Sequence, residues 1–276
     1  MNLFQALLLG IIQGLTEFIP VSSTAHLLIA EHFLNISPTE AATLSFSVLV
    51  QLGTIVSLAI YFWKDLLTIV VDTLKNLGGL RNFNSLAPNA KLGWYIVIAT
   101  IPALLAGVLL KDLVEALFKM PLIEASIRLL TAALLLTLAE SLGKRTRSLN
   151  SMTWLDALLI GLMQVLAVFP GASRSGTTIS GGMYRGFDRP AAARFAFLMS
   201  VPVMLAAGAY ETLGLLKMPN LGAFLPLIAV GFVTAALVGW LAIRWLLNYL
   251  NKHSLYVFAA YCAALGLICL AFEFLG

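Results

Sequence analysis

Apolar residues fill long stretches of the chain, and polar residues gather in the shorter segments between them. A helix needs about 20 mostly apolar residues to cross a bilayer. The pattern predicts six membrane-spanning helices, at residues 45–62, 93–110, 122–141, 195–213, 222–247 and 254–275. Aromatic and basic residues stand at their edges, as interfacial anchors do, for example Trp63, Trp94 and Trp245. We therefore expect an all-α polytopic membrane protein.

Two further apolar stretches, 3–34 and 153–183, are each interrupted by a polar segment. The interruptions read TEFIPVSSTAH and FPGASRSGTT, and each apolar arm has about 10–15 residues, too few to cross a bilayer alone. Non-helical backbone at membrane depth is tolerated only where protein or a water-filled cavity surrounds it. We interpret both stretches as re-entrant helical hairpins, which enter and leave the membrane on the same side. The alternative is a pair of kinked full spans.

The two interrupted stretches share a short pattern, and three predicted spans follow each of them. The shared residues are Gly10, Gln13, Pro20 and Ser23 in the first, and Gly161, Gln164, Pro170 and Ser173 in the second. An odd number of spans inverts the second unit relative to the first. We therefore expect one membrane domain, 1–276, built as an inverted-topology repeat with halves at about 1–142 and 152–276. Such repeats place their sites near the midplane, where discontinuous helices meet.

The 17 basic residues test this layout. Twelve fall on the side opposite the N-terminus: Lys64, Lys75, Arg81, Lys91, Lys144, Arg145, Arg147, Arg185, Arg189, Arg194, Arg244 and Lys252. Three fall on the N-terminal side, Lys111, Lys119 and Lys217, while Arg128 and Arg174 lie within the membrane region. Because cytoplasmic loops carry the excess of Lys and Arg, we expect both termini to face outward. Two full spans in place of the hairpins would largely cancel this bias.

Composition narrows the class of protein further. Hydrophobic residues make up 60% of the chain and charged residues only 11%, whereas a soluble domain carries about 25% charged residues. The net charge of +4 does not indicate nucleic acid, because the basic residues lie between spans. Cys262 and Cys269 lie in an apolar span and are expected to be small buried hydrophobes. Glu140 precedes Lys144 by one helical turn, so that lysine is its expected partner.

The first polar break carries a carboxylate at membrane depth. Gln13 and Glu17 are four residues apart and share a helix face. A charged residue in the bilayer costs about 2.5–3.5 kcal/mol even on lenient scales and is by default a functional candidate. Glu17 is therefore the first residue to which we assign chemistry, as a metal ligand or an acid–base group.

Three hydroxyl residues and a histidine follow in the same break. Ser22, Ser23 and Thr24 stand at a predicted helix N-terminus, which favours an anion, and Ser23 shares a face with His26. Ser23 offers a nucleophile and His26 a proton carrier. The alternative is that the hydroxyls only cap the helix and His26 only bonds to a backbone carbonyl.

The second polar break gathers hydroxyls around one guanidinium. The hydroxyl residues are Ser173, Ser175, Thr177 and Thr178, and Arg174 stands among them. Arginine is suited to a bidentate grip on phosphate oxygens, so we expect this break to bind phosphate. The alternative is a structural pair in which Arg174 holds Glu17 of the other break.

The two breaks resemble the signatures of one known family. Gln13-x-x-x-Glu17 with the following Pro-Val-Ser-Ser-Thr-Ala-His26, and Pro170-Gly-Ala-Ser-Arg-Ser-Gly-Thr-Thr178, are similar to the motifs of the bacitracin-resistance type of undecaprenyl-pyrophosphate phosphatases. The resemblance covers essentially the whole chain. It implies a phosphoric anhydride hydrolase of the bacterial plasma membrane that converts undecaprenyl diphosphate to undecaprenyl phosphate and inorganic phosphate. It also implies a role in peptidoglycan synthesis and cell shape, bacitracin resistance, and an active site reached from the outer face.

The resemblance also assigns roles to residues. It implies catalysis by Glu17, Ser23, His26 and Arg174. Substrate binding is expected from Gln13, Ser22, Thr24, Ser173, Ser175, Thr177 and Thr178. The implied cofactor is a divalent cation, Mg²⁺ or Ca²⁺, held by Glu17. Many members have Glu where this chain has Gln13, so phosphate oxygens and water must supply more of the metal shell.

Several alternatives remain open from the sequence. The nucleophile is Ser23, His26 or a water molecule. A transporter or flippase of the polyprenyl phosphate carrier would use similar phosphate-binding tips, since inverted repeats with broken helices are a transporter architecture. A scaffold for wall-synthesis enzymes would need neither polar break. Homo-oligomeric assembly and flipping of the product are left open as well.

Overall fold

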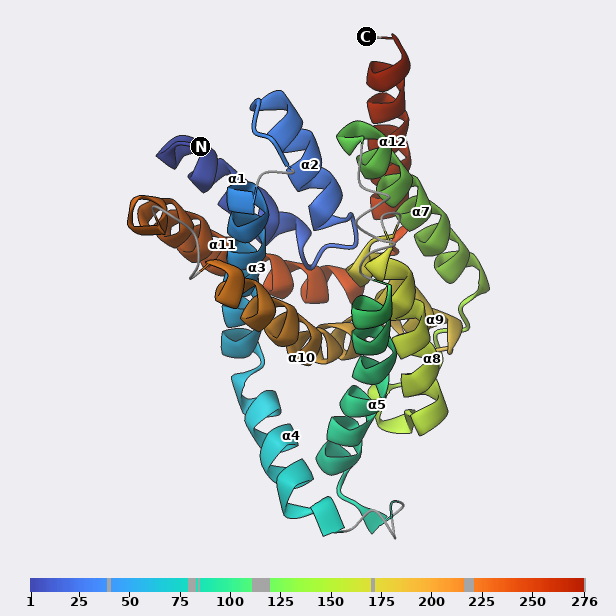
Figure 1. Cartoon of the computed structure of the whole chain (residues 1–276). Helices are drawn as coiled ribbons and strands as arrows, with labels where there is room; N and C mark the ends of the chain where they lie inside the picture. The colour runs from blue at the N-terminus through green and yellow to red at the C-terminus, as the bar shows by residue number, and fades with distance from the viewer. Residues whose placement is uncertain are drawn as a thin grey trace.

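The computed structural model of the protein describes residues 1–38, 41–78, 83, 85–110, 120–169, 172–215 and 221–275. Of residues 41, 210, 211, 213–215, 221 and 223 only the backbone is described. Residues outside this part include Pro170 and Gly171 of the second break, and four of the basic residues used in the charge count, Arg81, Lys111, Lys119 and Lys217. Within it, the chain forms helices joined by turns and no β-strand (Figure 1).

Six of the described helices are long and apolar enough to cross a membrane. They are α3 (Ala41–Tyr61), α5 (Pro88–Leu109), α7 (Pro121–Leu142), α10 (Arg189–Leu215), α11 (Leu221–Leu250) and α12 (Tyr256–Leu275). Each contains one of the six predicted spans or overlaps nearly all of it, so the expected all-α polytopic class is confirmed. The prediction succeeds because spanning length and apolarity are local properties of the sequence.

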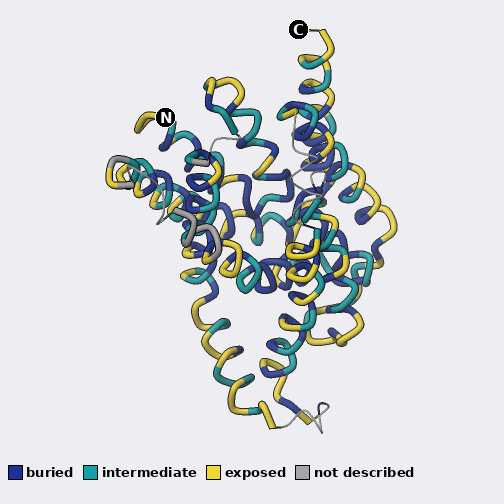
Figure 2. The backbone as a smooth tube through the Cα atoms, in the orientation of Figure 1, coloured by how far each residue is buried: buried dark blue, intermediate teal, exposed yellow. Residues whose placement is uncertain are grey.

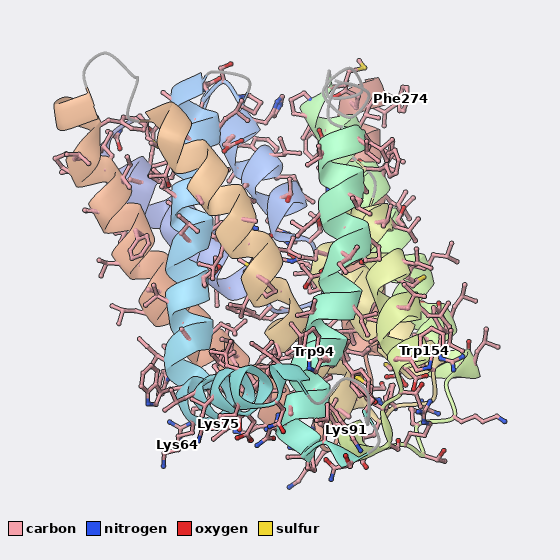
Figure 3. All side chains as sticks on the ribbon, turned by 60° about the horizontal axis from the view of Figure 1, so that its bottom comes forward. Lys64, Lys75, Lys91, Trp94, Trp154 and Phe274 are labelled. Atoms are coloured by element: carbon pink, nitrogen blue, oxygen red, sulfur yellow. The ribbon has the colours of Figure 1, made fainter. Side chains whose placement is uncertain are left out.

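A further helix, α4 (Trp63–Lys75), was not predicted. Figure 3 shows it lying across one end of the molecule, between the labelled Lys64 and Lys75. It exposes large apolar side chains at three- and four-residue spacing, Trp63, Leu67, Val70 and Leu74. A stripe with this spacing is typical of an amphipathic helix that lies in a membrane interface.

Both interrupted stretches fold into helical hairpins. The first forms α1 (Leu3–Thr16) and α2 (Ser23–Phe33), and its two ends meet where Gln5 donates a hydrogen bond to the Leu34 carbonyl, 3.4 Å. The second forms α8 (Trp154–Val165), a 3₁₀ turn (Leu166–Val168) and α9 (Arg174–Tyr184). Its ends meet where Arg185 pairs with Asp156, 2.7 Å. Described residues next to each break, Val21 in the first and Ala172 in the second, are buried.

Each hairpin packs against a long helix of the other half of the chain. Helix α1 packs on α11, and α8 packs on α5. Glycines permit the close approach: a Cβ on Gly10 would lie 2.7 Å from the Gly231 carbonyl oxygen, and one on Gly161 would clash with the Ala99 carbonyl oxygen. Gly10 and Gly161 are counterparts in the shared sequence pattern, and each lies against the backbone of a long helix.

Buried residues concentrate around the breaks, whereas α4 is largely exposed (Figure 2). The buried cysteines Cys262 and Cys269 are free thiols, which confirms their expected role as small hydrophobes.

Two buried carboxylates tie the helix ends together at one end of the molecule. Asp156 binds Arg147 (2.6 Å) as well as Arg185, and the hydrogen bond to Asp156 raises the pKa of Arg147 above its ordinary value. Glu140 binds Arg145 (2.5 Å) and Arg189 (2.6 Å). The expectation that Glu140 pairs with Lys144 is therefore wrong. Arg145, in the segment after α7, and Arg189, at the start of α10, occupy both carboxylate oxygens.

Candidate functional site

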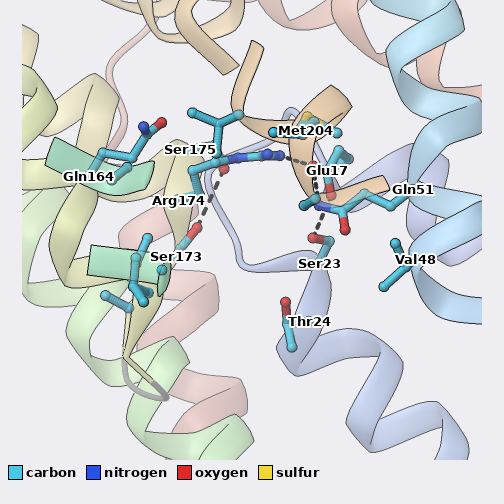
Figure 4. A pocket seen from close by; sticks show the side chains of 18 of the residues that line it. Glu17, Ser23, Thr24, Val48, Gln51, Gln164, Ser173, Arg174, Ser175 and Met204 are labelled. Atoms are coloured by element: carbon cyan, nitrogen blue, oxygen red, sulfur yellow. Dashed lines mark hydrogen bonds and ion pairs between the residues drawn. The ribbon is translucent and has the colours of Figure 1, made fainter. Parts of the chain in front are cut away.

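The tips of the two hairpins meet, with Arg174 of the second reaching toward Glu17 of the first (Figure 4). Arg174, the first residue of α9, forms an ion pair with Glu17, which directly follows α1. Ser175 makes a second link by donating to the Ile19 carbonyl, 3.4 Å. The structure thus joins residues that are 157 positions apart in the sequence.

Glu17 is the centre of this junction. Its side chain is 1% exposed. One oxygen, Oε2, accepts hydrogen bonds from Gln13 Nε2 and Ser23 Oγ, both 2.7 Å. The other, Oε1, pairs with Arg174 and accepts a longer bond from Gln51 of α3, 3.4 Å. Because the Ser23 hydroxyl donates to the carboxylate, its proton already points at a group that can accept it.

The first tip has an unusual backbone. Ser22 adopts a left-handed conformation with φ of 69°, which costs a non-glycine residue energy and often marks a functional site. Its Oγ accepts a bond from the Ala25 N–H, 3.4 Å, so Ser22 caps α2. The turn it creates places Ser23 at the first position of α2, facing Glu17.

The hydroxyls of the second tip bond mainly within their own helix. Ser173 caps α9 by accepting from the Gly176 N–H, 3.2 Å. Thr177 and Thr178 both donate to the Arg174 carbonyl, at 2.9 and 2.8 Å. They therefore stabilise the first turn of α9, from which the Arg174 side chain extends toward Glu17 (Figure 4).

A cavity of about 770 Å³ lies at the junction. Seven of the eleven predicted site residues line it: Glu17, Ser22, Ser23, Thr24, Ser173, Arg174 and Ser175. The other four, Gln13, His26, Thr177 and Thr178, lie off it. The remaining wall is mostly apolar and comes mainly from α3, α5 and α10, with smaller parts from α7, α8 and the 3₁₀ turn. The roles assigned to these residues remain predictions.

His26 points away from the cavity. Its Nδ1 lies 2.8 Å from the Ser22 carbonyl oxygen, and its Nε2 lies 2.8 Å from the Tyr261 hydroxyl on α12. Since a carbonyl only accepts, Nδ1 carries the proton and Nε2 accepts from Tyr261. The structure therefore places the expected proton carrier beside Tyr261 rather than in contact with Ser23.

Three further polar residues line the cavity that the motifs did not identify: Gln51, Arg128 and Gln164. Arg128 of α7 is buried, pairs with Glu124 (2.8 Å), and donates to the Ala172 carbonyl (3.2 Å). The sequence could have identified all three, because each lies within a predicted span or hairpin arm, where a polar side chain is a functional candidate.

The oxygen ligands of the cavity suit a hard divalent cation. Among the described residues there is no group of three or more His, Cys, Asp or Glu side chains that could hold an ion. Glu17 is the one carboxylate on the described cavity wall, accompanied by hydroxyl and amide oxygens. Such a set fits Mg²⁺ or Ca²⁺ ligated largely by phosphate and water, with Glu17 as the protein anchor.

Six described helices of spanning length, together with a cavity that holds a carboxylate–guanidinium pair, define a multi-pass membrane protein with an interior polar site. The chain belongs to the family described as bacitracin resistance protein BacA, which it matches over residues 6–268. The resemblance inferred from the two motifs is thereby confirmed.

Relatives in this family match nearly the whole chain. The undecaprenyl-diphosphatase of Anaeromyxobacter sp. (strain K) is 44% identical over 269 residues, which cover 96% of this chain and 90% of the relative. The undecaprenyl-diphosphatase of Chlorobium phaeovibrioides is 42% identical over 281 residues, covering 98% and 96%. That of Chloroherpeton thalassium is 41% identical over 286 residues, covering 100% and 98%.

Proposed function

We propose that this protein is a membrane phosphatase that hydrolyses undecaprenyl diphosphate to undecaprenyl phosphate and inorganic phosphate. Its family and the names of its relatives support the activity. The observation that carries the proposal at the site is the junction of the hairpin tips, where Ser23 and Arg174 meet the two oxygens of Glu17. A nucleophile, a base and an anion-binding cation thus share one buried cavity.

Ser23 is the proposed nucleophile. Its Oγ forms a bond to the terminal phosphorus, the bond from that phosphorus to the bridging oxygen breaks, and undecaprenyl phosphate leaves. Glu17, at 2.7 Å, takes the hydroxyl proton, and water then releases phosphate from the serine. Direct attack by water or by His26 stays open as an alternative.

Arg174 is the proposed phosphate clamp. Only one of its nitrogens pairs with Glu17 in the described contacts, and a guanidinium has five N–H donors. The remaining donors suit the phosphate oxygens and the charge that they carry during transfer. A divalent cation held by Glu17 would neutralise part of the same charge.

The apolar wall of the cavity suits the polyprenyl tail. Leu104 and Val108 of α5 line the cavity and are 39% and 79% exposed at the molecular surface. In a membrane this surface faces lipid, so the tail would lie along α5 while the diphosphate enters between the tips.

The membrane layout is part of the proposal. We infer two re-entrant hairpins in an inverted repeat, with both termini outside and the site reached from the outer face. The packing supports it, because the first helix of each hairpin packs on a helix of the opposite half: α1 on α11, and α8 on α5. The grouping of Lys64, Lys75 and Lys91 at the end opposite Phe274 (Figure 3) is consistent with a cytoplasmic end at those lysines.

The test is phosphate release from undecaprenyl diphosphate by the purified protein in detergent, with and without EDTA. The competing function is a flippase of the carrier, because packing between helices of opposite halves is also found in transporters. We expect stoichiometric phosphate release that EDTA suppresses and added Mg²⁺ or Ca²⁺ restores. Transport of undecaprenyl phosphate in vesicles without any phosphate release would overturn the phosphatase in favour of the flippase.

A further inference from the structure

One polar side chain of the cavity is buried there without a hydrogen-bond partner among the described residues. Gln164 of α8 lines the cavity and is 2% exposed. Neither its Nε2 nor its Oε1 has a hydrogen-bond partner within the described part of the chain. A buried amide without a partner destabilises a protein, because it has lost its hydrogen bonds to water. The amide of Gln164 is therefore expected to find its hydrogen-bond partner in a bound molecule.

Comparison with Gln13 explains why Gln164 lacks a partner. The two glutamines are counterparts in the shared pattern of the hairpins. Gln13 donates to Glu17, four residues later, at 2.7 Å. The residue four positions after Gln164 is Val168, which offers no acceptor and also lines the cavity. The second hairpin thus keeps the amide but lacks the carboxylate.

The surroundings of Gln164 indicate the chemistry of its partner. Figure 4 shows it on the same side of the cavity as Ser173 and Arg174, opposite Glu17 and Ser23. An amide NH₂ donates two hydrogen bonds, and phosphate oxygens accept them. We propose that Gln164 binds the substrate by donating from Nε2 to an oxygen of the lipid diphosphate. This assignment rests on the proposed function.

A substrate-binding role and a structural role predict opposite changes in stability. Gln164→Met keeps the length and approximate volume of the side chain but removes the unpartnered amide. The variant should therefore be as stable as the wild type or more stable, while binding the diphosphate less well. A glutamine that holds the fold together would lower the melting temperature when replaced.

Ser180→Ala is a matched control. The Ser180 hydroxyl is likewise buried without a partner among the described residues, but Ser180 does not line the cavity. Its replacement removes a buried polar atom without touching the site. We expect its kcat/KM to equal that of the wild type.

The experiment measures kcat/KM for undecaprenyl diphosphate, the inhibition constant of inorganic diphosphate, and the melting temperature in detergent. For Gln164→Met we expect kcat/KM to fall and the inhibition constant to rise, each about tenfold, with no drop in melting temperature. Unchanged kinetics in Gln164→Met, or a fall matched by Ser180→Ala, would overturn the inference while the phosphatase stands. If the wild type releases no phosphate, the proposed function fails instead.

Discussion

At the scale of single residues, Glu17 organises the site. It receives hydrogen bonds from α1, α2, α3 and α9 through Gln13, Ser23, Gln51 and Arg174. These contacts fix the position of the carboxylate before any substrate binds, which is the condition for electrostatic preorganisation. The sequence identified four of these five residues, because they stand in or next to the two polar breaks of apolar stretches. It did not identify Gln51, whose role depends on how α3 packs.

The residue with the most specific prediction is Ser23. If its Oγ attacks phosphorus, Ser23→Ala should lower phosphate release about 100-fold or more, since the covalent route is lost. Rapid quenching of the wild type with ³²P-labelled substrate should leave label on a peptide that contains Ser23. Label on His26, or an Ser23→Ala variant with at least half the wild-type rate, would contradict this assignment.

At the scale of elements, the second tip depends on α7 for its support. Arg128 holds the Ala172 carbonyl next to Ser173, and Glu124 pairs with Arg128 in the same buried position. The sequence contains the one-turn spacing of Glu124 and Arg128, although we did not predict the pair from it. It cannot suggest the Ala172 contact, which joins segments 44 residues apart in the chain. For the same reason, the local partner expected for Glu140 was wrong.

This support makes Arg128 a positioning residue for the tip. Arg128→Met leaves Glu124 as an unpaired buried charge and should lower the free energy of unfolding by about 3–5 kcal/mol. The double variant Glu124→Leu/Arg128→Met should recover the stability but not kcat, because the Ala172 carbonyl stays unsupported. Thermal melting and phosphate release in detergent measure the two effects. Recovery of both in the double variant would show that Arg128 is only half of a structural pair.

At the scale of the whole molecule, hydropathy predicted the six spans and the two stretches in which a break separates two helices, since each depends on the local run of apolar residues. It missed α4, whose apolar residues are spaced around one face rather than gathered in a run. The cavity was not predictable either, because its wall combines α3, α5 and α10 with the two tips. The inverted arrangement of the halves stays a prediction that sidedness measurements can decide.

Sidedness follows from labelling single cysteines with a membrane-impermeant maleimide. In a background with Cys262→Ala and Cys269→Ala, Phe274→Cys should react in intact cells, because the proposed layout places the end of α12 outside. Lys75→Cys on α4 should react only after permeabilisation. Both native cysteines are buried, so the unmodified protein serves as a low-labelling control. Labelling of both positions from the same side would rule out the layout.

The claim on which everything else depends is that the two hairpin tips form one catalytic site. The most direct test is the rate of phosphate release from undecaprenyl diphosphate by Glu17→Ala, Arg174→Ala and the double variant. We predict that each single variant loses about 100-fold or more, and that the double variant loses little beyond that, because the two residues act as a unit. A single variant with a near wild-type rate, or a double variant whose loss is the product of both, would contradict the claim.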